Sequence, residues 1–500
     1  MLLRFTAALL LTALGATPSA RAQDGLPPAV LHAMQTLGLP ADALAAVALP
    51  LGHRGAVWQH QARLPFQPGS SMKVVTSIVA LDRLGPNHRG FTAMRSAAAI
   101  SAGTLQGDLV LQGGGDVELG PSQLWSLLVD LRQAGVQHIA GDLLVDRTRY
   151  QPARLDIGLP PFDNAAEFAY NVIPDALMLN EGLLPLELRA TDSGVTAVTV
   201  PPIQGIVFDS SRMALVDARC ADWDDHWQPA ITTRSADGQT LITLNGAFPR
   251  GCTQRTRLQL VDRADLTDKL FRSLWQGLGG TWAGRAREAG TVADVPANTR
   301  ALARRQGRPW AELMRHLNKF SDNAWTRVLY LELGVPQMAS QPHKTTRELA
   351  DAAVRQWLAQ QGLDDTGLVL DNGSGLSRTE RISPLLLAQM LKAAHAGKNA
   401  PELLMSLPTV AVDGTMRNRL KDSPAAGWAR LKTGTLRNVV ALAGYVKDKD
   451  GRPWVLVAMV NHDTLASRSR PVLDALVDHI ARHGLQAPAV MGVGPQGDGP

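Results

Sequence analysis

The stretch PGSSMK at residues 68–73 runs directly into an apolar segment with helical spacing. Its first two residues predict a turn, and residues 74–81 predict a helix that ends before Gly85-Pro86. Ser70 and Lys73 then lie close together on one side of the helix. A lysine can take a proton from a serine once burial or a nearby positive charge has lowered its pKa toward neutrality. We therefore predict that Ser70 is a nucleophile and that Lys73 is its base.

Two more short motifs follow far along the chain, SDN at residues 321–323 and KTGT at residues 432–435. Each motif alone is typical of a helix cap, a turn or a strand end, and an S-x-x-K pattern arises by chance about once in a chain of this length. In this order, however, the three motifs are the signature of active-site serine enzymes that handle penicillin and D-Ala-D-Ala peptides. We expect Ser321 to pass a proton to the leaving amine. We expect Asn323 to accept a hydrogen bond from Lys73 and to donate one to a substrate carbonyl.

The third motif is predicted to lie on a strand edge beside the serine. Lys432, Thr433 and Thr435 can bind a terminal carboxylate through charge and hydroxyl groups. Lys432 is also the positive charge that we expect next to the base. Gly434 has no Cβ, so the substrate can approach the strand closely. The oxyanion hole is expected to consist of the backbone N–H groups of Ser70 and Thr435.

The chain divides into segments of different character. Residues 1–22 have the basic start, short apolar run and small residues of a cleavable secretory signal. Residues 95–295 contain short apolar runs separated by glycine, aspartate and proline, which predict inserted α/β domains. The flanking segments, 23–94 and 296–484, are expected to form one discontinuous catalytic domain. The glycine- and proline-rich tail at 485–500 is expected to be disordered.

Composition narrows the class of protein further. The chain is 45% hydrophobic and 19% charged, with a formal net charge of +5 and no basic run of the kind that binds nucleic acid. This mild charge suits contact with an anionic cell wall or membrane surface. Cys220 and Cys252 are the two cysteines, and in an exported protein they are expected to form a structural disulfide. No motif indicates a metal or another cofactor.

Further segments extend the resemblance to a known family. DNGSGLSR at residues 371–378, VDGT at 412–415 and GGGD at 113–116 resemble segments of the D-alanyl-D-alanine carboxypeptidase/endopeptidase family, the penicillin-binding protein 4 type of class C penicillin-binding proteins (peptidase family S13). The resemblance implies a multidomain α/β (α+β) fold. Its penicillin-recognising core is similar to serine transpeptidases and β-lactamases, with a five-stranded antiparallel sheet flanked by helices. The two ends of the chain would form this core.

The resemblance also implies roles for residues outside the three motifs. Arg378 resembles a residue that lines the substrate site, and Arg437 lies at a position where the family contacts substrate. Asp163 lies nearest to the family's acidic residue that recognises the amino group of the stem-peptide diamino acid. The implied activity is that of a periplasmic serine-type D-Ala-D-Ala carboxypeptidase and DD-endopeptidase. It would act on peptidoglycan stem peptides during cell-wall remodelling, and β-lactams would inhibit it covalently through Ser70.

Two other functions share the same motifs. A β-lactamase needs a device that activates the deacylating water, often a glutamate between the first and second motifs. That interval is here a domain-sized insertion in which no such glutamate is identified. A non-catalytic penicillin-binding cell-wall protein would keep the motifs without peptide turnover. Release of D-Ala from a pentapeptide, together with labelling by a fluorescent penicillin, distinguishes the three functions.

Overall fold

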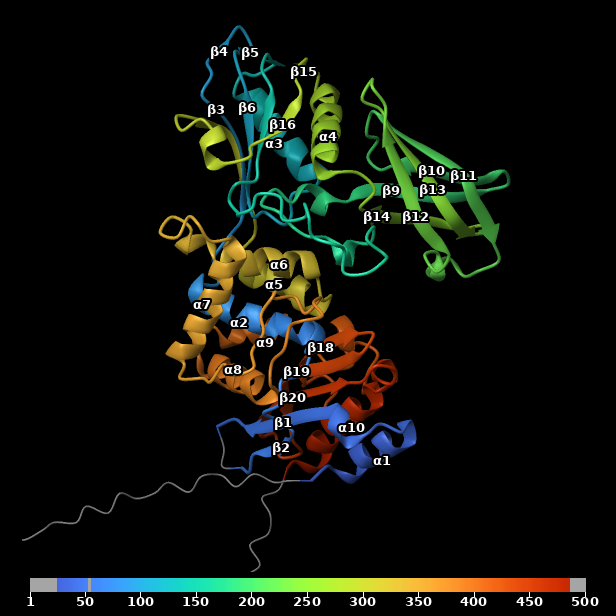
Figure 1. The fold of residues 1–500 in the computed structure, drawn as a ribbon, viewed down its shortest axis with the longest axis vertical. Helices are drawn as coiled ribbons and strands as arrows, with labels where there is room; N and C mark the ends of the chain where they lie inside the picture. Colours follow the sequence, from blue (N-terminus) through green and yellow to red (C-terminus); the bar gives the residue numbers. More distant parts are fainter. Residues whose placement is uncertain (1–24, 53–54, 486–500) are drawn as a thin grey trace, which may run out of the picture.

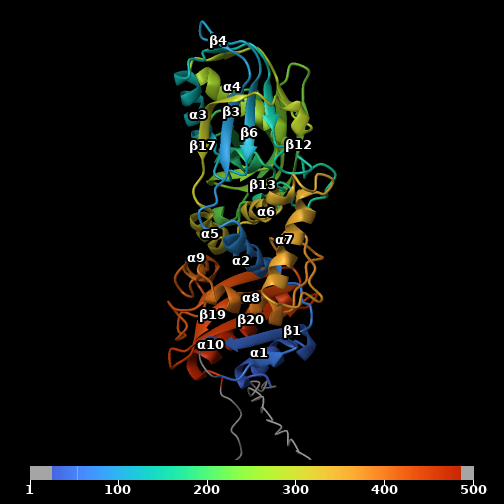
Figure 2. The ribbon, with the colours of Figure 1, turned by 90° about the vertical axis from the view of Figure 1, so that its left-hand side faces the viewer.

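The computed structural model describes residues 25–52 and 55–485 of the chain. The expected signal segment at 1–22 lies outside these residues, as does the expected tail apart from residue 485. The molecule is elongated, with the catalytic core at one end and the inserted domains at the other (Figures 1 and 2). None of the helices in the described ranges is long and apolar enough to cross a bilayer.

The core contains a five-stranded antiparallel sheet in the order β18-β19-β20-β1-β2, as expected. Pairing of β1 with β20 joins the two ends of the chain. The Asp450-Gly451 turn connects β19 to β20, and Asp448 accepts backbone hydrogen bonds from residues 450 and 452 there. The strands are β1 (Leu44–Pro50), β2 (Trp58–His60), β18 (Arg430–Leu436), β19 (Val439–Lys447) and β20 (Pro453–Asn461).

Helices cover both faces of this sheet because its strands carry apolar side chains on both sides. Ala45 and Val47 belong to one hydrophobic cluster, whereas Leu44 and Ala46 belong to the other. The second cluster is covered by α1 (Pro28–Leu37) and α10 (Arg470–His483). The first is covered by α2 (Lys73–Arg83), α5 (Trp310–Lys319), α6 (Asn323–Glu332), α7 (Thr346–Gln360), α8 (Pro384–Ala396) and α9 (Ala400–Ser406) (Figure 1).

The insertion begins with an α/β module. Its main sheet has the order β16-β8-β6-β3-β17, and a smaller sheet has the order β15-β7-β5-β4. β3 and β17 lie partly or wholly outside the expected 95–295 range, so the inserted sheet extends past both expected limits. The elements are β3 (Phe91–Ser96), β4 (Ile100–Ser101), β5 (Thr104–Leu105), β6 (Leu109–Gly114), α3 (Pro121–Gln133), β7 (His138–Ile139), β8 (Leu143–Asp146), α4 (Arg263–Gly277), β15 (Thr281–Trp282), β16 (Ala286–Glu288) and β17 (Arg300–Gln306).

A second inserted module projects to the side (Figure 1). Residues 184–258, all of them described, form strands and one short 3₁₀ turn but no α-helix, so the helices of the inserted region lie in the first module. Its two small sheets have the orders β10-β9-β14 and β11-β13-β12, and many of their side chains stay exposed. The strands are β9 (Leu184–Thr191), β10 (Gly194–Thr199), β11 (Ile206–Val216), β12 (Trp227–Arg234), β13 (Thr240–Pro249) and β14 (Thr253–Leu258).

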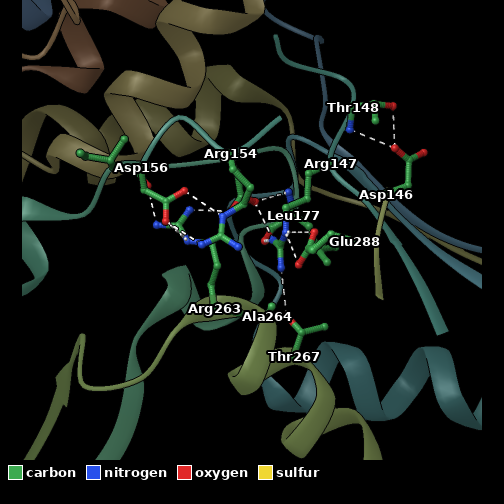
Figure 3. Close-up of polar contacts among 12 residues, drawn as sticks. Asp146, Arg147, Thr148, Arg154, Asp156, Leu177, Arg263, Ala264, Thr267 and Glu288 are labelled. Carbon is green, nitrogen blue, oxygen red and sulfur yellow. Dashed lines mark hydrogen bonds and ion pairs between the residues drawn. The ribbon is translucent and has the colours of Figure 1, made fainter. Parts of the chain in front are cut away.

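Ion pairs fasten the insertion internally and to the core. Arg147, directly after β8, is buried and contacts Asp175 in a loop. It also contacts Glu288 of β16 (Figure 3). Glu332, at the end of α6, accepts hydrogen bonds from Arg149 across the domain junction. Burial alone would raise the pKa of Glu332, but its hydrogen-bond donors lower it to about 2. This carboxylate is therefore ionised at neutral pH and holds the two domains together.

Cys220 and Cys252 form a disulfide within the strand-rich module, as predicted. The bond closes a loop with a sequence separation of 32 residues. We expect the Cys220→Ala, Cys252→Ala double variant to lose roughly 3 to 4 kcal/mol of unfolding free energy in this module, because its unfolded chain gains entropy. Denaturant unfolding followed by tryptophan fluorescence measures this, since Trp223 and Trp227 lie in the module. Unchanged unfolding midpoints in the double variant would contradict the structural role.

Candidate active site

The predicted nucleophile lies where a 3₁₀ turn, η2 (Gly69–Met72), runs directly into α2. Gly434 of β18 packs against this turn. A Cβ on Gly434 would lie 2.4 Å from Pro68 O and 3.1 Å from Ser70 N. A Cβ on Gly69 would likewise lie 3.2 Å from Thr435 N. The two glycines thus allow close backbone contact between η2 and β18, with Ser70 N and Thr435 N at this contact.

Lys73 lies at the centre of the site and is fully buried. Its Nζ is 3.0 Å from Ser70 Oγ, 2.6 Å from Asn323 Oδ1 and 2.5 Å from Ser374 O. Burial is the main reason why its pKa is lowered to about 7, and the positive charge of Arg327 adds to the effect. A substantial fraction of Lys73 is therefore neutral near pH 7 and available to take a proton.

The second motif connects α5 to α6. Asp322 caps α6 by accepting a hydrogen bond from Trp325 N at 2.8 Å. Ser321, just before this cap, has a φ of 61°, a left-handed conformation that is unfavourable for a residue with a Cβ. In this conformation Ser321 Oγ accepts a hydrogen bond from Lys432 Nζ at 2.9 Å. The cap and the lysine together hold the second hydroxyl in the site.

The third motif lies on β18, the outermost strand of the sheet. Lys432 is buried, and its pKa is lowered by burial and then by the charge of Lys73. Thr433 Oγ1 donates to Thr415 Oγ1 at 2.7 Å, which brings the VDGT segment to the site. Thr435 is exposed. The motif thus presents an exposed threonine, Thr435, and the buried amine of Lys432, which contacts Ser321.

Two of the more distant candidates lie beside each other. Arg378 donates to Phe162 O at 3.1 Å, and its guanidinium lies over the Phe162 ring. The next residue, Asp163, accepts hydrogen bonds from the Tyr170 hydroxyl, while Tyr170 O accepts one from Asn323 at 3.0 Å. Hydrogen bonds through Tyr170 therefore link Asp163 to Asn323 of the second motif. Arg437 is exposed in the turn between β18 and β19, and its role in substrate binding stays a prediction.

Three groups near Lys73 were not predicted. Ser374 contributes a backbone carbonyl, which a motif of side chains does not reveal. Arg327 follows Asn323 by four residues on α6, so helical spacing could have placed it on the same face. The positive charge of Arg327 lowers the pKa of Lys73. Lys432, the cation that we expected beside the base, also interacts electrostatically with Lys73. Glu380 is fully buried beyond the 371–378 segment, and nothing in its local sequence indicates that burial.

Comparison with known proteins agrees with this geometry. The model of the D-Ala-D-Ala carboxypeptidase 3 (S13) family matches residues 30–482. The chain belongs to this family. It is therefore a serine-type D-Ala-D-Ala carboxypeptidase that acts on the cell wall, and the predicted family is confirmed.

Individual relatives cover most of the S13 chain. It is 29% identical over 439 residues to a D-alanyl-D-alanine carboxypeptidase of Actinomadura sp. (strain R39), covering 84% of this chain and 78% of the relative. It is 26% identical over 408 residues to the D-alanyl-D-alanine carboxypeptidase DacB of Haemophilus influenzae, covering 78% of this chain and 80% of the relative. The crystal structure of penicillin binding protein 4 (dacB) from Haemophilus influenzae aligns with a TM-score of 0.72 at 23% identity, covering 89% and 97%. This alignment supports the fold.

The contact between η2 and β18 gives a direct prediction. Gly434→Ala would place a methyl group against Pro68 O and Ser70 N, so the strand must move away from the serine. We expect acylation by a fluorescent penicillin to slow about 100-fold or more. Gly277→Ala is the matched control, because a Cβ on Gly277 would meet no atom within 4 Å. Equal acylation rates in the two variants would show that the contact is not needed.

Proposed function

We propose that Ser70 attacks the carbonyl carbon of the penultimate D-Ala of a peptidoglycan stem peptide and that Lys73 takes its proton. The observation that carries this proposal is the 3.0 Å separation between the fully buried Lys73 Nζ and the partly buried Ser70 Oγ. Burial favours the neutral amine, and only the neutral amine can accept the serine proton. No histidine is needed for this step.

Acylation then proceeds by two linked proton transfers. As the bond from Ser70 Oγ to carbon forms, the proton moves to Lys73 Nζ, and the backbone N–H groups of residues 70 and 435 stabilise the oxyanion. As the carbon–nitrogen bond breaks, Ser321 Oγ gives its proton to the leaving amine. Ser321 takes a proton from Lys432 Nζ, which lies 2.9 Å from its Oγ. The proton that Lys73 accepted then passes to Lys432, so both lysines return to their starting state. Water then hydrolyses the ester and restores Ser70.

Substrate recognition uses charge complementarity on both sides of the scissile bond. Lys432 and the hydroxyls of Thr433 and Thr435 would bind the terminal carboxylate, and Gly434 leaves space for the peptide backbone. On the opposite side, Asp163 would bind the amino group of the stem-peptide diamino acid. Hydrogen bonds from its neighbours lower the pKa of Asp163 against the effect of burial, which keeps the carboxylate charged. Arg378 and Arg437 would complete the substrate contacts.

The same chemistry gives the second activity and the inhibition. When the leaving amine belongs to a cross-linking side chain, cleavage at Ser70 is a DD-endopeptidase reaction. A β-lactam presents a strained amide and a carboxylate to the same groups, so it would acylate Ser70. We propose that the S13 chain works in the periplasm, where its disulfide would be stable. It would meet the cell wall or membrane surface only peripherally.

Digestion of cross-linked muropeptides tests this function. We expect the wild-type protein to release D-Ala and to cleave cross-links, and Ser70→Ala to lose both activities by about 10⁴-fold or more, because the nucleophile is gone. Ser193→Ala, at an exposed serine of the strand-rich module, is the control and should keep wild-type rates. Full activity of the Ser70→Ala variant would refute the proposal, whereas fast β-lactam turnover with no D-Ala release would favour a β-lactamase.

A further inference from the structure

A buried carboxylate fixes the loop that contacts the base. Glu380 Oε1 accepts hydrogen bonds from Asn372 N at 3.1 Å and from Gly373 N at 2.8 Å. Its side chain is fully buried. The same loop presents Ser374 O to Lys73 Nζ at 2.5 Å. Glu380 therefore determines where one of the three hydrogen-bond partners of Lys73 lies.

The loop is held tightly on its other sides. A Cβ on Gly373 would lie 2.4 Å from the Tyr330 ring and 2.6 Å from Thr76 Oγ1. A Cβ on Gly375 would lie 1.9 Å from Gly69 O, in the turn that carries the nucleophile. Because the loop packs against α2, α6 and η2, a shift at its anchor would be transmitted to the serine and its base.

Charge gives Glu380 a second connection to Lys73. Titratable groups from several elements interact with the two residues: Asp322, Arg327 and Tyr330 from α6 and its cap, Asp371 from the loop and Lys432 from β18. Arg347 and Asp351 of α7 act on Tyr330, one step further away. Among the carboxylates that interact with Lys73, Glu380 is fully buried, whereas the Asp322 side chain keeps 17% of its exposure. Glu380 Oε2 is also buried, without a hydrogen-bond partner among the described residues.

We propose that Glu380 is a positioning residue for Lys73: it anchors the 371–378 loop that orients the amine and supplies the negative charge that stabilises the ammonium group formed during acylation. In the attack step the proton of Ser70 Oγ goes to Lys73 Nζ, and Glu380 accepts no proton. The inference rests on the proposed roles of Ser70 and Lys73. It assigns Glu380 a function that the three motifs do not contain.

Titration of the two residues agrees with this arrangement. Burial, and then the charge of Asp371, raises the pKa of Glu380 to about 7, while the loop amides and Lys73 oppose the shift. Above this value Glu380 is negative, and its charge raises the pKa of Lys73. Removing the charge must therefore lower the pKa of Lys73. Because acylation needs the neutral amine, the rate falls as the pH drops below the pKa of Lys73, and this acidic limb would move to lower pH.

The test compares second-order acylation rates with a fluorescent penicillin from about pH 5.5 to 9. We expect the wild-type acidic limb to lie near the Lys73 value of about 7. Glu380→Gln keeps the size and an acceptor oxygen but removes the charge. The acidic limb of its rate profile should therefore lie at lower pH than that of the wild type, by roughly one unit. Its plateau rate should fall roughly tenfold, because the less basic amine accepts the proton less readily. Glu402→Gln is the matched control. Glu402 Oε2 is likewise buried with no hydrogen-bond partner in the described part of the chain, but Glu402 lies on α9, and its profile should match the wild type.

The outcomes separate this inference from the proposed function. A Glu380→Gln profile with the wild-type limb would overturn the inference, and the proposed function would stand if Ser70→Ala still abolished labelling. Failure of the wild-type protein to label at Ser70 would overturn both. If thermal melting shows that Glu380→Gln does not fold, Glu380→Asp and Glu380→Asn repeat the comparison at a shorter length. The acidic limb of Glu380→Asp should then lie at the wild-type pH, and that of Glu380→Asn at lower pH. Acidic limbs at the same pH in these two variants would contradict the inference.

Discussion

The active site depends on backbone contact between η2 and β18, two segments that lie at opposite ends of the chain. Gly434 and Gly69 make this contact: a Cβ on Gly434 would overlap Pro68 O, and one on Gly69 would press against Thr435 N. Pairing of β1 with β20 sets the approximate distance between the chain ends, and the glycines bring them to touching distance. Because this contact places Ser70 beside Lys432 and Thr435, every later step of the chemistry follows from it.

Burial of positive charge is the second constraint. Lys73 and Lys432 have no exposed surface, and Arg327 is also buried, so desolvation lowers the pKa of all three. The free-energy cost of this arrangement is offset by carboxylates on several elements, among them Asp322 and Glu380. The result is a lysine that can exchange a proton with a serine near neutral pH. The inserted modules contain buried ion pairs of their own, such as Arg147 with Asp175, outside the active site. The insertion also contributes the loop that carries Asp163.

Much of this architecture could be predicted from the sequence because it depends on local pattern. The three motifs identified the side chains that surround Ser70, and the resemblance to the family implied the five-stranded core sheet. Contacts that are specified by packing could not be predicted. The carbonyl of Ser374 has no side-chain signature, and the burial of Glu380 depends on loops from distant parts of the chain. The short apolar runs of the strand-rich module indicated strands but not how these strands pair into two separate sheets, which depends on contacts between distant segments.

Covalent adduct mapping tests the central claim most directly. The protein is incubated with benzylpenicillin at neutral pH, digested and analysed by peptide mass spectrometry, with a Lys73→Ala variant treated in parallel. The account predicts a single penicilloyl adduct on the peptide that contains Ser70, and its near absence from the variant. An adduct on another residue, or equal labelling of the variant, would contradict the conclusion that a buried lysine activates this serine.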